Sequence, residues 1–334
     1  MKKDFHILAL SGGGFRGLYT ATILEQIENA VGRPLANSFD LICGTSIGGI
    51  LALGLAAEIS TQNLKNIFIK NGARIFSSKL SFLQNFSYKT FGGCWKARDS
   101  QKELQRVLTE QFGDKEIGDL KHRVLIPTVN CDKGLGQFIK TPHHPSFKLD
   151  YKWKIVDAAL ATSAAPTYFP IFKNSVGRFV DGGLVGNAPG LFGYHEARHF
   201  LSDNPEELNI RVLCIGTANQ QFGLAGSQKL DIGFLCWKEK LTNLWLSAQE
   251  GSNFYLLNHL LGKNLRYVDD QPSHDQARDI GLDIASEEAI TVLQNLANSR
   301  SQKLLGDSEF QVFLTHQAEI PTFYYGAHAK KEIQ

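Results

Sequence analysis

The chain has 334 residues, of which 43% are apolar, and its formal net charge at pH 7 is only +2. This length and this apolar fraction suit one large domain, or one domain with a helical extension. The nearly neutral charge gives no indication of wholesale binding of a nucleic-acid polymer.

Cysteine usage and apolar patterning indicate a protein of the cytoplasm. The longest apolar run, residues 47–57, is too short to span a membrane, and the first one ends at Leu10, too early for a signal peptide. No C-x-x-C pair is present, so the five cysteines are expected to be reduced: Cys43, Cys94, Cys131, Cys214 and Cys236. We therefore expect a soluble cytoplasmic protein that can still visit a membrane surface.

A glycine-rich turn follows the first predicted strand, residues 6–10, and precedes a predicted helix over 18–31. Gly12, Gly14 and Gly17 match the G-x-G-x-x-G fingerprint of dinucleotide-binding proteins, which predicts an NAD(P)-dependent oxidoreductase. That fingerprint requires an acidic residue after the second strand, whereas Asp40 stands before it. Alternatively, the bare amides of Gly13 and Gly14 form an oxyanion hole, with the charge of Arg16 beside it.

The second predicted strand, residues 41–43, leads into Gly44-x-Ser46-x-Gly48 and then into an apolar helix from Ile47. This pattern is typical of a nucleophile elbow, a turn so tight that glycines must flank the serine. The turn lifts the Ser46 hydroxyl clear of the sheet at a helix N-terminus, where developing negative charge is stabilised. An ordinary strand-to-helix turn would give the same pattern, so the motif alone leaves both interpretations open.

Residues 59–98 contain no acidic side chain, and lysines and arginines alternate there with phenylalanines and Trp95. Such a mixture suits contact with anionic phospholipid. It equally suits a lid or a partly buried insertion with a basic outer face.

Asp181 ends a short predicted strand, residues 178–180, and is followed by Gly182 and Gly183. An acid at a strand end before two glycines suits a functional site, although Asp-Gly turns are common. The strands predicted at 124–129 and 209–217, and the helices at 102–111 and 155–161, complete an alternating α/β pattern. Its sheet is expected to be mostly parallel.

A helix after Pro189 contains His195-Glu196-x-x-His199, which matches the H-E-x-x-H signature of zinc proteases. No third ligand is evident downstream, and nothing else in the chain indicates zinc. The adjacent pair His143 and His144 lies in a proline-flanked loop without metal-ligand spacing.

The remaining third, from about residue 221 to 334, is predicted to be mainly helical and shows no catalytic constellation. A helix is predicted over 238–261, and Ser286 is predicted to cap another that runs to Ala297.

The carboxyl ends of parallel strands meet at one edge of a sheet, where ligands bind. The Gly12–Gly14 turn, Ser46 and Asp181 would therefore come together. A serine hydroxyl needs a base to take its proton before the oxygen can act as a nucleophile. His195 and His199 lie inside a helix, so Asp181 acting directly on Ser46 is the simpler arrangement.

The ordered set of motifs resembles the patatin-like phospholipases. It consists of the glycine turn, the serine elbow, Ala161-Thr162-Ser163-Ala164-Ala165-Pro166-Thr167-Tyr168-Phe169 and Asp181-Gly182-Gly183. The match covers about residues 5–220 of a single domain, and residues 282–286 resemble the family's C-terminal helices. Many relatives carry aspartate where this chain has Ser11, a position that supports the loop more than the chemistry.

The resemblance implies a three-layer α/β fold with a mostly parallel central sheet. It also implies a Ser46–Asp181 dyad, an oxyanion hole formed by Gly12, Gly13 and Gly14 with Arg16, and hydrolysis of glycerophospholipid acyl esters without a metal or cofactor.

In its length and in its Trp- and Phe-rich C-terminal region, the chain is most similar to bacterial stand-alone patatins. Some of these are anti-phage effectors that a cyclic dinucleotide switches on. The resemblance thus implies a cyclic dinucleotide activator and peripheral contact with the inner membrane when active. Homo-oligomerisation stays open, and so does a non-catalytic lipid- or nucleotide-binding regulator that has kept the fold.

Overall fold

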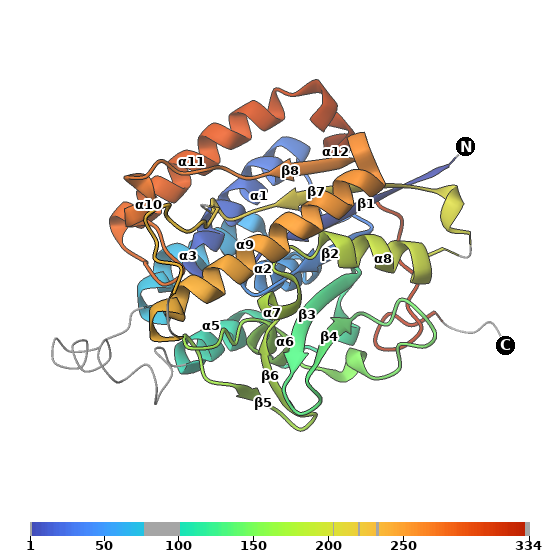
Figure 1. Cartoon of the computed structure of the whole chain (residues 1–334). Coiled ribbons are helices and arrows are strands. Elements are labelled where there is room, and N and C mark those ends of the chain that lie inside the picture. Colours follow the sequence, from blue (N-terminus) through green and yellow to red (C-terminus); the bar gives the residue numbers. More distant parts are fainter. Residues whose placement is uncertain (1, 77–100, 203, 220, 232–233, 331–334) are drawn as a thin grey trace.

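The computed structural model describes residues 2–76, 101–202, 204–219, 221–231 and 234–330. Its centre is a mixed eight-stranded sheet with the order β5-β6-β3-β2-β1-β7-β8, and β4 pairs with the free edge of β3 (Figure 1). The parallel strands are β1 (Lys3–Leu10), β2 (Leu41–Gly44), β3 (Val124–Asn130), β7 (Leu208–Ile215) and β8 (Leu265–Val268). The antiparallel strands are β4 (Leu135–Lys140), β5 (Phe172–Lys173) and β6 (Arg178–Asp181).

Helices cover both faces of the sheet, so its central strands are apolar on both sides. In β1, Leu8 and Leu10 face one apolar core, whereas Ile7 and Ala9 face a second one. Continuous apolar runs of this kind are typical of parallel strands buried in a three-layer fold. The predicted α/β architecture is confirmed, with an antiparallel edge that the sequence did not indicate.

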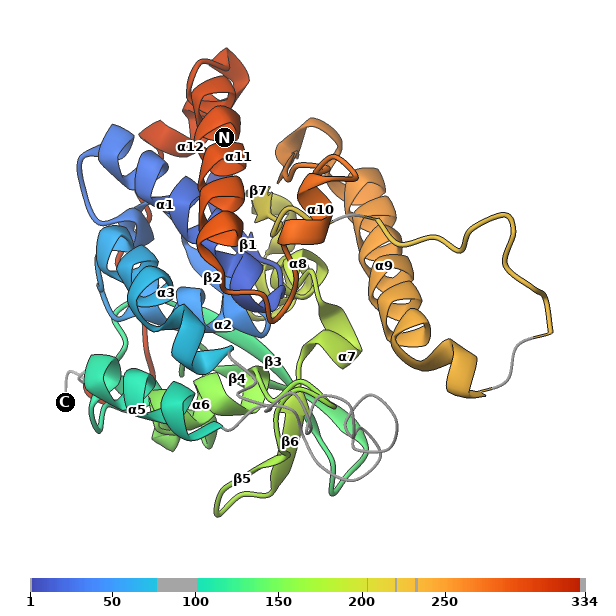
Figure 2. The same ribbon diagram turned by 90° about the vertical axis from the view of Figure 1, so that its left-hand side faces the viewer.

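The helical layers are visible in two perpendicular views (Figures 1 and 2). One side of the sheet carries α1 (Gly17–Val31), α2 (Ile47–Ala56), α3 (Thr61–Ile75), α5 (Gln101–Phe112), α6 (Ile155–Thr162) and α11 (Glu287–Leu305). The opposite side carries α8 (Gly190–Phe200) and α9 (Phe234–Leu261). Short helices are α7 (Gly183–Gly186), α10 (Gln276–Asp279) and α12 (Gln311–Thr315). Among the described residues no helix is long and apolar enough to cross a bilayer.

The start of the basic and aromatic segment is part of the core rather than a lipid-facing surface. Phe68 and Phe76 are buried and pack against Phe15, which follows the glycine turn. Lys65 forms an ion pair with Glu25 of α1. The prediction for residues 77–98 lies outside the described part of the chain.

Asp40 has a structural role, which argues against the dinucleotide-binding interpretation. Its carboxylate accepts the His6 amide at 2.8 Å and contacts the His316 ring at 2.8 Å. Asp40 lies just before the amino end of β2, whereas the glycine turn follows the carboxyl end of β1. The acidic residue that the fingerprint requires is therefore already engaged.

The helix predicted after Ser286 is confirmed, and it is longer than expected. The Ser286 hydroxyl accepts the Ala289 amide at 3.1 Å as an N-cap, and α11 continues to Leu305. Residues 282–286, expected to be helical, instead form an irregular loop. This loop lies against the glycine turn, because Leu282 supplies its carbonyl to the Phe15 amide at 2.8 Å.

Candidate active site

Ser46 occupies a strained position between β2 and α2, as a nucleophile elbow requires. Its φ of 55° lies in the left-handed region, which is rare for a residue with a side chain. A Cβ at Gly48 would lie only 2.3 Å from the Leu10 carbonyl oxygen, so only glycine fits there. The Ser46 amide donates to Thr162 Oγ1 at 3.0 Å, which fixes the turn to the end of α6.

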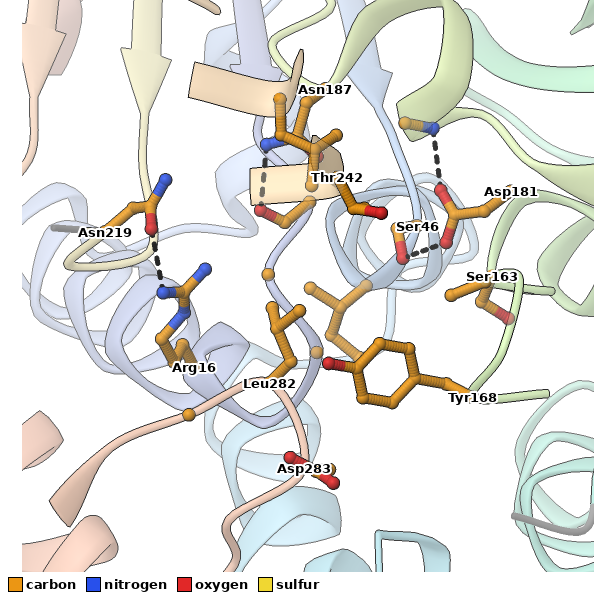
Figure 3. A pocket seen from close by; sticks show the side chains of 18 of the residues that line it. Arg16, Ser46, Ser163, Tyr168, Asp181, Asn187, Asn219, Thr242, Leu282 and Asp283 are labelled. Atoms are coloured by element: carbon orange, nitrogen blue, oxygen red, sulfur yellow. Dashed lines mark hydrogen bonds between the residues drawn. The ribbon is translucent and has the colours of Figure 1, made fainter. Parts of the chain in front are cut away.

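The Ser46 hydroxyl donates to Asp181 Oδ2 at 2.6 Å (Figure 3). The second carboxylate oxygen, Oδ1, accepts the Gly183 amide at 2.7 Å. Asp181 is only 6% exposed, and the two bonds orient its carboxylate toward the serine. A buried base in contact with a nucleophile is the arrangement that activates a serine.

Strand β3 explains how residues 135 positions apart meet. One edge of β3 is taken by β4, and the other edge is shared by β2 at Val124–Leu125 and by β6 at Thr128–Asn130. Strand β2 runs parallel to β3 whereas β6 runs antiparallel, so their carboxyl ends converge on this shared edge. The sequence predicted the meeting correctly but assumed parallel strands, and this assumption is wrong for β6.

Burial raises the pKa of Asp181 to about 6, and the hydrogen bonds from Ser46 and Gly183 oppose that shift. The carboxyl is therefore mostly ionised at pH 7 and able to accept a proton. A base with a pKa close to the working pH suits proton transfer.

We expect kcat/KM for a water-soluble ester to fall about tenfold for each pH unit below 6, because only ionised Asp181 can take the serine proton. The measurement is a pH–rate profile between about pH 4.5 and 8. A profile flat down to pH 5 would contradict Asp181 as the base, provided that circular dichroism shows the protein folded throughout.

The three glycines of the glycine turn, Gly12, Gly13 and Gly14, line the pocket. Gly12 is held in place, since its amide donates to the Asn187 carbonyl at 3.0 Å and its own carbonyl accepts Asn187 Nδ2 at 3.3 Å. Within the described part of the chain, no residue accepts a hydrogen bond from the Gly13 or Gly14 amide. Two free N–H donors in a cavity that also holds a nucleophile can stabilise an oxyanion.

Arg16 lines the same pocket, but its guanidinium extends toward a different wall. Nη1 donates to Asn219 Oδ1 at 2.8 Å, away from Ser46 (Figure 3). A direct contact between Arg16 and the oxyanion thus stays a prediction. The other motif residues lie at element ends: Gly17 starts α1, Gly44 ends β2, Gly48 is in the first turn of α2, and Gly182 and Gly183 lie at the start of α7.

These groups open into a cavity of about 450 Å³. The C-terminal third, in which the sequence showed no functional residues, supplies a large share of its walls. The lining residues from that third are Phe222, Thr242, Asn243, Leu246, Pro272, Ala277, Ile280, Gly281, Leu282 and Asp283. The sequence also gave no role to Thr162, Asn187 or Asn219, which position the elbow, the glycine turn and Arg16.

The H-E-x-x-H motif is outside this cavity and is engaged in other contacts. The Glu196 carboxylate binds Lys140 Nζ at 3.0 Å and the buried His143 ring at 3.0 Å. His195 and His199 lie next to each other on the exposed side of α8, with ring centroids 4.4 Å apart and the rings tilted by 35°. Within the described ranges, no group of three histidine, cysteine or carboxylate side chains could hold a metal ion.

A family model described as patatin-like phospholipase matches residues 8–190, more than half of the chain, and includes the glycine turn, Ser46 and Asp181. The chain belongs to the patatin-like phospholipase family. Membership confirms the resemblance inferred from the motifs and the predicted class of enzyme, a lipid acyl hydrolase.

This patatin-like phospholipase is similar over nearly its whole length to three bacterial proteins that share the name cGAMP-activated phospholipase. The one from Pseudomonas aeruginosa is 50% identical over 96% of this chain and 95% of its own length. The Vibrio cholerae protein is 38% identical and covers 91% of both chains. The Escherichia coli protein is 35% identical, covering 89% of this chain and 87% of its own.

Proposed function

We propose that this patatin-like phospholipase cleaves acyl esters of glycerophospholipids through a Ser46–Asp181 dyad. The observation that carries the proposal is the 2.6 Å hydrogen bond from the Ser46 hydroxyl to a buried carboxylate, both of which line a cavity of about 450 Å³. Ser46 Oγ attacks the ester carbonyl while Asp181 accepts its proton. Asp181 then returns that proton to the departing lysophospholipid oxygen, which leaves an acyl group on Ser46.

Water completes the cycle. Asp181 takes a proton from the attacking water and returns it to the departing Ser46 Oγ as the second tetrahedral intermediate collapses. This step releases a fatty acid and restores both Ser46 and the ionised Asp181. In both steps the negative charge on the carbonyl oxygen is stabilised by the Gly13 and Gly14 amides, with Arg16 adding positive charge to the pocket.

We further propose that a cyclic dinucleotide of the cGAMP type switches the enzyme on. The support is the shared name of the three relatives and their match over nearly the whole chain. Activity would then be restricted to times when the signal is present, which suits an enzyme whose substrate is a cellular membrane. Peripheral contact with that membrane and a role in anti-phage defence are parts of this proposal.

The test is release of fatty acid from phospholipid vesicles by wild type and Ser46→Ala, with and without cGAMP, beside a matched set with cyclic di-GMP. We expect release of fatty acid only from wild type and only in the presence of cGAMP. Release without any nucleotide would refute the switch but leave the hydrolase intact. If all samples are silent, a fluorophosphonate probe decides the hydrolase proposal, because failure to label Ser46 in the presence of cGAMP would overturn it.

A further inference from the structure

Helix α9 crosses the outside of the molecule and leaves its outer face uncovered. It runs across the front in Figure 1 and along the outer side in Figure 2. Leu241 is 47% exposed, Trp245 is 55% exposed and Tyr255 is 65% exposed. Exposed apolar side chains that gather on one surface usually mark an interaction site.

Some of the exposed residues of α9 follow a regular spacing. The α9 seam consists of Leu241, Trp245, Ala248, Ser252, Tyr255 and His259, which succeed one another in alternating steps of four and three residues. All six are exposed. This spacing places side chains in one line along a helix, and it is the spacing with which two helices pack side by side.

The order of residue sizes in the seam is self-complementary. Small side chains, Ala248 and Ser252, lie at its centre, whereas larger ones lie toward both ends. If two copies pack antiparallel about position 250, Trp245 meets Tyr255 of the second copy, Leu241 meets His259, and the small residues face one another. Such pairing of a surface with itself is what a two-fold symmetric dimer requires.

The charge pattern favours a protein partner over a lipid surface. Lys238 and Lys240 lie near the start of α9, but from residue 241 to 262 the chain has no lysine or arginine, and the single acid of that stretch, Glu250, is buried. A helix that lies on a membrane normally carries basic residues along its polar face. Interface centres, in contrast, are depleted in charge and enriched in aromatic residues.

Residues 221–231 add apolar surface on the same side of the molecule. This loop projects outward beside α9 (Figure 2), and within it Leu224 is 40% exposed while Leu230 is completely exposed. The uncovered surface is therefore larger than the helix alone.

We propose that the α9 seam is the interface of a two-fold symmetric homodimer in which the two α9 helices pack antiparallel. The pairing bears on the candidate active site because Leu246 lines the cavity and Gln249 accepts the Asn187 amide at 2.8 Å. A partner helix would thus hold in place the element that supports Asn187 and, through it, Gly12.

The test is sedimentation velocity of the full chain at micromolar concentration, without nucleotide or lipid. We expect wild type to sediment as a dimer, and Trp245→Lys and Tyr255→Glu each to sediment as a monomer. The double variant should return to a dimer, because antiparallel packing brings the two new opposite charges together across the interface. Ile320→Lys, at a site that is 95% exposed and outside α9, is the matched control and should remain a dimer.

Circular dichroism checks that each variant is folded, as expected for changes at an exposed helix face. A monomeric wild type would overturn the proposal, and so would single variants that stay dimeric. A double variant that stays monomeric would overturn the antiparallel register. If monomeric wild type binds phosphatidylglycerol vesicles and Trp245→Lys abolishes that binding, the seam is a lipid-binding surface instead.

Discussion

Replacement of Ser46 by alanine is expected to lower kcat for a water-soluble ester by at least about 10⁴-fold, with little change in KM. Without the Ser46 hydroxyl, which donates to Asp181 Oδ2, the proposed acyl-enzyme cannot form. Asp181→Asn should be nearly as severe, because the amide keeps the shape of the carboxylate but cannot accept the serine proton.

The same Asp181→Asn variant should be more stable than wild type at pH 7. Burial raises the pKa of Asp181 from 3.8 to about 6, so the fold favours the neutral acid. The stability that this preference contributes is present below about pH 4 and is lost as the pH rises through 6, a difference of about 3 kcal/mol. Urea unfolding at pH 4 and pH 7 measures it: the gain from asparagine should appear at pH 7 and vanish at pH 4.

Matched controls separate the dyad from the H-E-x-x-H alternative. His199→Ala should retain full activity, since this ring lies on the exposed side of α8 away from the cavity. Loss of activity in His199→Ala or after addition of a chelator would contradict the dyad. So would an Asp181→Asn variant that hydrolyses the ester within tenfold of the wild-type rate.

The second large effect is expected for Gly14→Ala. Gly14 has a φ of +57°, and a Cβ there would lie 2.1 Å from the Leu282 carbonyl oxygen. That carbonyl also binds the Phe15 amide, so the clash must move either the glycine turn or the loop after α10. We expect activity to fall at least about 100-fold, as when an oxyanion donor is lost, and stability to fall by about 2–4 kcal/mol.

Gly113→Ala is the control that isolates the clash. Gly113 has a φ of +58°, almost the same as Gly14, but nothing lies within 4 Å of its added Cβ. Gly113→Ala should lose only the stability that a positive φ costs a residue with a Cβ, about 1 kcal/mol, and it should keep full activity. Ester hydrolysis and urea unfolding of both variants make the comparison. Equal effects would show that contact with Leu282 does not constrain the turn.

The parts of the site that could be predicted are those in which local backbone geometry dictates the residue type. The elbow around Ser46 and the turn at Gly12–Gly14 need glycine for steric reasons, so they leave a signature in the sequence. Asp181 could be predicted from its position at the end of a strand, although the antiparallel direction of that strand could not. Ser286 was found because an N-cap depends on a few neighbouring residues only.

The parts that were missed act through features without a local signature. Leu282 contributes a backbone carbonyl, which any residue could supply, and Asn187 makes its contacts with a turn 175 positions away. Phe68 and Phe76 belong to a stretch whose composition resembles a lipid-binding surface, yet tertiary packing buries them. Composition cannot distinguish these outcomes, because a surface and a core use the same aromatic residues.

Because β2 and β6 converge on one edge of β3, the separation of the two reactive groups is set by seven residues, Val124–Asn130, rather than by the whole intervening chain. Insertions and deletions in the loops that connect the elements between Ser46 and Asp181 should therefore leave the geometry of the two reactive groups intact, whatever they do to substrate choice. A single residue inserted inside β3 has a different effect. It would shift β6 by one position relative to β2 and turn alternate side chains to the opposite face of the sheet. Variation in chain length among such enzymes is thus expected to avoid this short strand and to gather in the connections on either side of it.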